Sequence, residues 1–177
     1  MSTIYSATSA SVSKMIKLYI TKLSLSEKPH DAALRALDIA LFDTFSIRRS
    51  DCRIEKTQSG KPFFPDRADI KFNLSHSGEY AVAAVSDREV GVDIEWIRPV
   101  NPRIADRYLH GIVRGTRVAD IIEAWCRKES YGKFTGAGLL KADFLQPHYI
   151  EVFNCIDGYI VAVCTAERDN TEIFIFE

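Results

Sequence analysis

Two short stretches of this sequence carry side chains that could do chemistry together. Asp93 and Glu95 stand two apart in the run Gly-Val-Asp-Ile-Glu, and Glu129 and Lys133 stand four apart in Lys-Glu-Ser-Tyr-Gly-Lys. Residues two apart on a strand project from one face, and residues four apart on a helix share a face. Three carboxylates and an ammonium group at one point would form a Mg²⁺ site with a phosphate-binding cation beside it.

Each pair also has an ordinary structural interpretation. A Glu–Lys pair four apart is common on helix surfaces and adds only about 0.2–0.5 kcal/mol to helix stability. Asp-x-Glu is also typical of the solvated face of an edge strand. Neither pair predicts a site when it is taken alone, so the rest of the chain has to decide.

Two further segments offer groups that could bind a phosphate. Gly60-Lys61-Pro62 places a cation on a turn. The run Phe72-Asn73-Leu74-Ser75-His76-Ser77 places a hydroxyl and an imidazole at the expected end of a strand, where free backbone N–H groups also point outward. Adjacent Ser and His on a strand face opposite ways and no Gly-x-Ser-x-Gly motif is present, so a Ser-His-Asp hydrolase is not indicated.

The composition excludes several classes of protein. The chain has 177 residues, of which 46% are hydrophobic and 27% charged, and this is typical of one domain or of two small packed halves. A net charge of −1 gives no drive toward nucleic acid or an anionic membrane. The four cysteines form no CxxC pair, residues 1–13 lack a signal-peptide pattern, and no apolar run approaches about 20 residues. We therefore expect a cytoplasmic protein with reduced thiols.

The hydrophobic pattern predicts the elements that must position these side chains. Alternation predicts a strand over 14–23, and a helical period predicts a helix to residue 45 with Asp31 as its N-cap. Two more helices are expected over about 103–109 and 116–134. The remaining strands are expected over 53–56, 72–74, 81–85, 90–94, 149–154, 159–165 and 172–176, with residues 75–78 connecting the second of these to the third.

Strands that are segregated from helices indicate an α+β fold rather than alternating βαβ units. Each half of the chain has a helical stretch followed by a group of strands. We therefore expect one domain over residues 1–177, built from two similar, pseudo-duplicated α+β halves of about 14–98 and 99–177. Antiparallel or mixed sheets would pack with the helices, and the active site would lie between the halves. Because both halves are in one chain, a monomer is expected.

The order of four motifs resembles a known family. Gly-Lys-Pro, Phe-Asn-Leu-Ser-His-Ser, Gly-Val-Asp-Ile-Glu and Trp-x-x-Lys-Glu-Ser-x-x-Lys follow one another between about residues 54 and 165. This resembles the 4′-phosphopantetheinyl transferases, specifically the surfactin-synthetase-activating type. The resemblance implies that the 4′-phosphopantetheine arm of coenzyme A is transferred to a serine of an apo acyl or peptidyl carrier protein. The other product would be adenosine 3′,5′-bisphosphate.

The resemblance also implies a role for each matching residue. Asp93 and Glu129 match the ligands of Mg²⁺ (or Mn²⁺), and Glu95 matches a third ligand that acts directly or through water. Glu129 also matches the proposed general base, and Lys133 matches the lysine that faces the pyrophosphate. The positions that hold the adenosine 3′-phosphate end are matched by Lys61, Ser75 and His76.

The chain departs from the family pattern in the helix before Gly-Lys-Pro. Members usually carry an arginine there that reaches the 3′-phosphate, whereas an ungapped count places Asp38 at this position. Arg35, one turn earlier, is the expected substitute, with Arg48 and Arg49 as alternatives. Lys128 is a candidate contact for a phosphate or for the carrier protein.

Two other functions remain open at this stage. A Mg²⁺-dependent hydrolase of coenzyme A or another nucleotide pyrophosphate would use similar carboxylates, but it would favour a more Glu-rich helix than one with only Glu123 and Glu129. A non-catalytic homologue that only binds carriers would have no need for the whole set of carboxylates and lysine. Coenzyme A and a carrier protein are the expected partners, with neither nucleic acid nor membrane.

Overall fold

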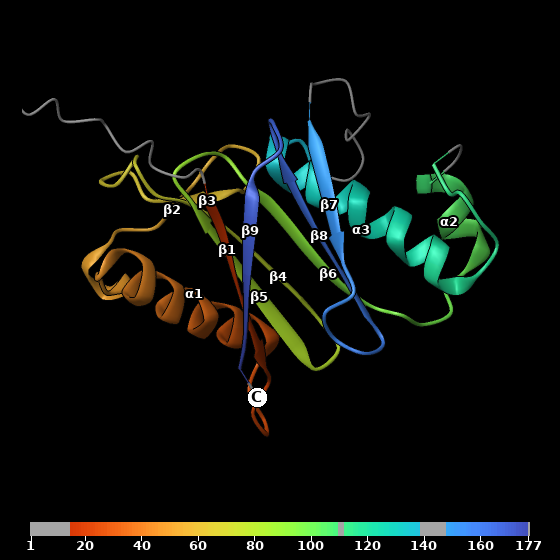
Figure 1. Cartoon of the computed structure of the whole chain (residues 1–177), viewed down its shortest axis with the longest axis horizontal. Coiled ribbons are helices and arrows are strands. Elements are labelled where there is room, and N and C mark those ends of the chain that lie inside the picture. Colours follow the sequence, from red (N-terminus) through yellow and green to blue (C-terminus); the bar gives the residue numbers. More distant parts are fainter. Residues whose placement is uncertain (1–14, 110–111, 139–147, 177) are drawn as a thin grey trace, which may run out of the picture.

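A computed structural model of the chain describes residues 15–109, 112–138 and 148–176 (Figure 1). Its helices are α1 (Pro29–Phe45), the 3₁₀ turn η1 (Arg49–Asp51), α2 (Pro102–Leu109) and α3 (Val118–Thr135). Its strands are β1 (Met15–Lys22), β2 (Glu55–Lys56), β3 (Pro62–Phe63), β4 (Lys71–Ser77), β5 (Tyr80–Ser86), β6 (Gly91–Trp96), β7 (Tyr149–Phe153), β8 (Tyr159–Thr165) and β9 (Asn170–Phe176). Within the described part of the chain, no helix is both long and apolar enough to cross a bilayer.

The first sheet has the strand order β4–β5–β1–β9. β9 runs parallel to β1, and the other neighbours are antiparallel. Helix α1 covers one face of this sheet, because its small and apolar side chains recur at helical spacing and pack on the strands. The helix side of that contact is Ala36, Leu37, Ala40 and Leu41, and the strand side includes Tyr19, Phe72, Ala83 and Val85.

Helix α1 begins at Pro29, before Asp31, which the sequence predicted as the N-cap. Lys28 is the N-cap and Pro29 occupies the first helical turn, so the expectation for Asp31 is wrong. The reason is that the fixed φ of proline suits the first helical position, where no backbone N–H is needed. Asp31 lies in the first turn instead, where its charge complements the helix dipole.

The second sheet has the order β6–β8–β7 with antiparallel pairs, and helix α3 covers its outer face. Ile122 and Cys126 of α3 pack there against Ile160 and Ala162 of β8. The inner faces of the two sheets pack on each other in the main core, through residues that include Leu18, Val82, Val92, Ile94 and Val161. The layers are therefore α1, first sheet, second sheet and α3 (Figure 1).

Both sheets are built by the same local sequence of elements. In β1–α1–β4–β5 and in β6–α3–β7–β8, a strand and a helix precede two strands, and the last strand pairs between the other two. The mixed α+β class is thus confirmed. β9 then returns to the edge of the first sheet, and α2 is inserted between β6 and α3.

Strand β4 is longer than predicted, and this changes the environment of its polar residues. Residues 75–77 are not a connection, because Ser75 and Ser77 pair with Val82 and Tyr80 of β5. The turn is at Gly78, which has a φ of 55° and whose added Cβ would lie 2.4 Å from the Tyr159 hydroxyl oxygen. The small polar residues suggested a turn, but their hydroxyls find partners on β6 instead.

Candidate active site

The predicted site residues gather where an edge strand of each sheet meets the other. β4 and β6 belong to different sheets, and alternate side chains of β4 join them. The Val92 N–H donates to Asn73 Oδ1 at 3.0 Å, and Ser75 and Ser77 each donate to a carboxylate of β6. Every second side chain of β4 therefore contacts β6, and every second side chain of β6, including Asp93 and Glu95, faces α3.

Asp93 is the centre of this arrangement and is 3% exposed. Its Oδ1 accepts hydrogen bonds from Ser75 Oγ at 2.7 Å and from Lys133 Nζ at 2.7 Å. Lys133 Nζ also donates to Ser75 Oγ at 2.8 Å, so strand β4, strand β6 and helix α3 meet in one triangle. The other oxygen, Oδ2, is buried without a hydrogen-bond partner among the described residues.

Glu95 lies two residues further along β6. Ser77 Oγ donates to its Oε2 at 2.8 Å and accepts a hydrogen bond from the Trp96 N–H at 3.2 Å. Burial raises the pKa of Glu95, and the charge of Asp93 raises it further, while Ser77 opposes the shift. The carboxylate is thus held in place, but its charged form is disfavoured.

Glu129 reaches the same region from α3, one turn before Lys133. Burial and then the charge of Asp93 raise the pKa of Glu129, while Lys133 lowers it. Within the described residues its carboxylate has neither a hydrogen bond nor an ion pair. A half-buried carboxylate with a raised pKa is suited to accept a proton near neutral pH.

The donor set fits a divalent cation in part. Asp93 Oδ2 is a buried acceptor that has no hydrogen-bond partner among the described residues, and the charge of Asp93 adds to burial in raising the pKa values of Glu95 and Glu129. The described residues contain no ready-made group of three or more His, Cys, Asp or Glu side chains around one point. The carboxylates instead meet Lys133, Ser75 and Ser77.

Lys61 is held at the end of α3. Its Nζ donates to Glu89 Oε2 at 2.7 Å, to Phe134 O at 3.0 Å and to Val90 O at 3.3 Å. A cavity of about 240 Å³ lies between this turn, β4 and α3, and both Lys61 and Lys133 line it. The two predicted lysines are therefore brought to one cavity.

His76 lies on the opposite face of β4 from Ser75 and is exposed. Partial burial of the ring lowers its pKa, and the charges of Lys133 and His30 lower it further. Ser75 therefore belongs to the carboxylate cluster, whereas His76 faces the side where helix α1 begins.

The candidates for the missing arginine have partners of their own. Arg35 forms two hydrogen bonds to Glu27, at 3.0 and 2.9 Å, and this contact raises the pKa of Arg35. The same contact lowers the pKa of Glu27 to about 2. Arg49 pairs with Asp38 at 2.8 Å, while Arg48 is exposed.

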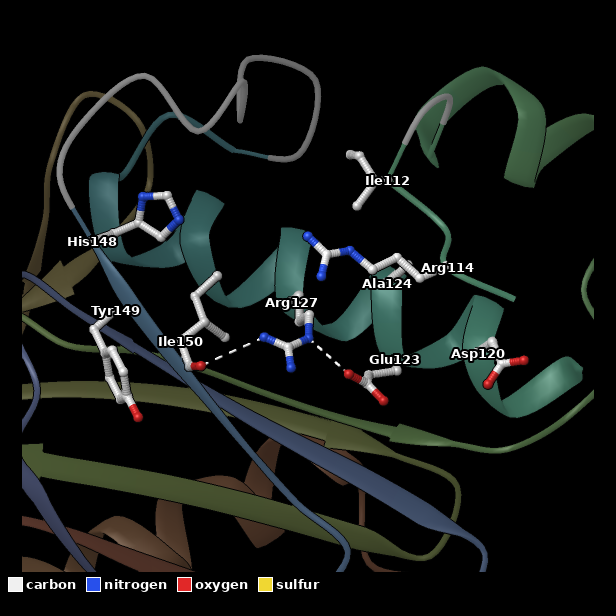
Figure 2. Close-up of a pocket in the computed structure, with 9 residues that line it drawn as sticks. All are labelled: Ile112, Arg114, Asp120, Glu123, Ala124, Arg127, His148, Tyr149 and Ile150. Carbon is white, nitrogen blue, oxygen red and sulfur yellow. Dashed lines mark hydrogen bonds and ion pairs between the residues drawn. The ribbon is translucent and has the colours of Figure 1, made fainter. Parts of the chain in front are cut away.

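A second cavity, of about 540 Å³, lies on the other flank of α3 (Figure 2). There Arg127 Nε donates to Glu123 Oε1 at 2.8 Å, and Arg127 Nη1 donates to Ile150 O at 3.5 Å. Arg114 points into the same hollow. None of the predicted site residues lines this cavity, so it is separate from the carboxylate cluster.

Sequence reasoning missed three residues that hold the site together. Asn73 and Ser77 bridge β4 to β6, and Glu89 binds Lys61. The signal for the first two was present, because Asn73 and Ser75 alternate with the apolar Phe72 and Leu74, and Ser77 continues the same period of two. Nothing in the sequence pointed to Glu89, which meets Lys61 across 28 positions.

Comparison with known proteins identifies the arrangement. Residues 89–173 match the family model of the 4′-phosphopantetheinyl transferase superfamily, and this range includes β6 and α3. The chain is 29% identical over 159 residues to the 4′-phosphopantetheinyl transferase Sfp of Bacillus subtilis, covering 72% of this chain and 69% of that protein.

Two other relatives carry the same activity in their names. The 4′-phosphopantetheinyl transferase gsp of Aneurinibacillus migulanus is 35% identical over 107 residues, which is 56% of this chain and 44% of that protein. The 4′-phosphopantetheinyl transferase AcpT of Salmonella typhimurium is 34% identical over 123 residues, which is 61% of this chain and 64% of that protein. With the cluster of Asp93, Glu129 and Lys133 in the matched range, the chain resembles the 4′-phosphopantetheinyl transferase superfamily.

Proposed function

We propose that this protein is an enzyme that transfers the 4′-phosphopantetheine group of coenzyme A to a serine of an apo carrier protein. The products are the holo-carrier and adenosine 3′,5′-bisphosphate. The observation that carries this proposal is the Lys133–Asp93–Ser75 triangle, with Glu129 on the same helix face as Lys133. Asp93, Glu129 and Lys133 lie within residues 89–173, which match the family model, and Ser75 precedes this range.

Transfer needs a group that takes the serine proton and positive charge that meets the phosphate oxygens. Glu129 is the proton acceptor, because its carboxylate has a raised pKa and is not held by another described residue. Lys133 faces the pyrophosphate and stabilises the charge that grows on the departing bisphosphate. Ser75 orients both Lys133 and Asp93.

Asp93, Glu95 and Glu129 are the residues that would hold Mg²⁺ or Mn²⁺. When bound, this ion neutralises pyrophosphate oxygens and favours cleavage of the phosphoanhydride bond. Asp93 Oδ2 supports this assignment, because a buried carboxylate oxygen without a partner is costly unless a cation meets it.

For the adenosine 3′-phosphate end we propose His76 and Lys61, with Arg35 as the substitute for the missing helix arginine. The cavity that Lys61 and Lys133 both line supports this proposal, because it offers space for an anion beside two cations. To bind the phosphate, Lys61 would have to give up its hydrogen bond to Glu89, and Arg35 would have to give up its hydrogen bond to Glu27.

We also propose one domain over residues 1–177 that is monomeric, acts in the cytoplasm and consists of two pseudo-duplicated halves. The shared strand order of the two units supports duplication. By strand pairing, the halves would divide between β5 and β6, earlier than residue 98, because β6 pairs with β8.

The test is mass spectrometry of apo carrier proteins after incubation with coenzyme A, Mg²⁺ and this enzyme. We expect a mass gain equal to one phosphopantetheine group on the acceptor serine. Release of the bisphosphate without any gain on a carrier would favour the pyrophosphate hydrolase instead. Carrier binding without either product would favour a non-catalytic homologue.

A further inference from the structure

Glu89 lies between two lysines, in the connection from β5 to β6. Its Oε2 accepts a hydrogen bond from Lys61 Nζ at 2.7 Å, and its Oε1 lies 3.3 Å from Lys71 Nζ. Although burial alone would raise the pKa of Glu89, its contacts with Lys61 and Lys71 lower it. The carboxylate is therefore held in its charged form, and each of its oxygens meets a different ammonium group.

Lys61 has one hydrogen bond that a ligand could replace. An ammonium group has three donors, and in Lys61 all three are used. Two of the acceptors are backbone carbonyls, Val90 O directly before β6 and Phe134 O in α3. The third acceptor is the Glu89 side chain, which is 52% exposed. An anion that binds Lys61 Nζ would therefore displace the Glu89 carboxylate and leave the link between β6 and α3 in place.

Lys71 gives the displaced carboxylate a second partner. Glu89 and Lys71 both line a cavity of about 210 Å³. Lys61 lines this cavity and also the cavity of about 240 Å³ that it shares with Lys133. An ionised carboxylate that loses its partner inside a protein is costly, but Glu89 keeps Lys71 when it gives up Lys61. Lys61 could thus exchange Glu89 for an anion in the second cavity without leaving either lysine or the carboxylate unpaired.

We propose that Glu89 competes with the 3′-phosphate of coenzyme A for Lys61, and so sets the affinity of the enzyme for ligands that carry this phosphate. The inference rests on the proposed transferase function, in which Lys61 binds the adenosine 3′-phosphate end. A phosphate monoester carries a charge of about −1.5 to −2 near pH 7, so Lys61 attracts it strongly and Glu89 repels it. A nucleotide without the 3′-phosphate has no group to exchange with Glu89, so its affinity does not depend on this residue.

The same competition acts on the product. Adenosine 3′,5′-bisphosphate keeps the 3′-phosphate, so Glu89 weakens its binding as well as that of coenzyme A. When the bisphosphate leaves, the Glu89 carboxylate returns to Lys61. Glu89 therefore favours product release, a step that limits the turnover of many enzymes, and it does so at the expense of affinity for coenzyme A.

The test is calorimetric titration of the enzyme with coenzyme A and with 3′-dephospho-coenzyme A. Glu89→Gln removes the competing charge and keeps the size of the side chain. We expect this variant to lower the Kd for coenzyme A on the order of tenfold, and to change the Kd for 3′-dephospho-coenzyme A by less than about twofold. The control is Glu172→Gln, which removes the same charge from an exposed position on β9, at the opposite edge of the first sheet from β4. It should change neither Kd.

Lys71→Ala should act in the opposite direction, because Glu89 then loses its second partner and is held more firmly by Lys61. We expect the Kd for coenzyme A to rise about threefold or more in the wild-type background, and to change by less than about twofold in the Glu89→Gln background. Equal weakening in both backgrounds would mean that Lys71 contacts the phosphate directly, and would overturn the exchange.

Two results separate this inference from the proposed function. If wild-type enzyme prefers coenzyme A to its 3′-dephospho form, but Glu89→Gln leaves the Kd for coenzyme A unchanged or raises it, the competition is overturned and the 3′-phosphate site stands. If wild-type enzyme binds both forms equally, the 3′-phosphate site is overturned together with this inference. The mass gain of a carrier protein tests the transfer itself.

Discussion

At the scale of single residues, Lys133 joins three parts of the site, since its ammonium group meets both Asp93 and Ser75. We expect Lys133→Ala to lower kcat on the order of 10²-fold or more, because the cation meets charge that develops during transfer. Lys133→Arg should rescue poorly, since a planar fork does not reproduce a compact ammonium group. Steady-state transfer to one carrier measures both variants. A kcat near that of wild type for Lys133→Ala would mean that the ion pair between α3 and β6 is only structural.

Glu129 and Glu123 provide a matched pair on one helix. Glu129→Gln should abolish most transfer, because an amide does not accept the serine proton. Glu123→Gln changes the same kind of side chain on the other flank of α3, where Glu123 pairs with Arg127, and it should keep near-normal kcat. Circular dichroism checks that both variants fold. Equal kcat in the two variants would exclude Glu129 as the proton acceptor.

At the scale of elements, the first residue of β6 sets how closely α3 approaches the strand. An added Cβ on Gly91 would lie 2.1 Å from Ser130 O and 2.4 Å from Phe134 N, both in the α3 backbone. Lys61 links the same two elements, because its Nζ donates hydrogen bonds to Val90 O, directly before β6, and to Phe134 O in α3. The distance between Lys133 and Asp93 therefore depends on this contact.

We expect Gly91→Ala to push α3 away from β6, which should cost about 1–3 kcal/mol of stability and lower kcat tenfold or more. Gly158→Ala is the control, because an added Cβ there meets no atom within 4 Å, and its φ of 74° tests the effect of backbone strain alone. Urea unfolding and transfer assays measure the two effects. If both variants lose stability equally and both keep normal kcat, the close approach does not position Lys133.

At the scale of the whole molecule, the half-buried carboxylates of Glu95 and Glu129 lower the stability of the fold by an amount that depends on pH. The pKa values of Glu95 and Glu129 are raised, so folding favours their protonated forms. Their favourable contribution is fully present below the ordinary pKa of 4.5 and is lost as pH rises through the raised values. In buffer with a chelator, Glu95→Gln/Glu129→Gln should therefore melt at a higher temperature than wild type near pH 7.

The advantage of this double variant should shrink as pH falls toward 4.5. Glu27→Gln should behave in the opposite way, because Arg35 lowers the pKa of Glu27 to about 2. That variant should melt below wild type near neutral pH, and the difference should shrink as pH falls toward 2. Thermal melts over this pH range measure both differences. A constant difference for the double variant would mean that burial does not disfavour these charges.

Most helices and strands, and the chemical types of the side chains at the site, could be predicted from the sequence. Hydrophobic periods placed α1, α3 and most strands close to their observed positions, because each pattern depends only on near neighbours in the chain. The same local rules predict that Asp93 and Glu95 share one face of a strand, and that Glu129 and Lys133 share one face of a helix. The resemblance to the family followed from the order of four motifs, and the comparisons confirm this resemblance.

Which faces of these helices and strands contact one another could not be predicted from the sequence, because it depends on packing between distant elements. Ser75 and Ser77 continue β4 because they find β6 across a gap of 18 positions, and local composition carries no information about such a partner. The partner of Lys61, the parallel pairing of β9 with β1 and the contact of α2 with α3 are likewise non-local. Alternation along an element tells which side chains share a face, whereas packing between distant elements decides what that face touches.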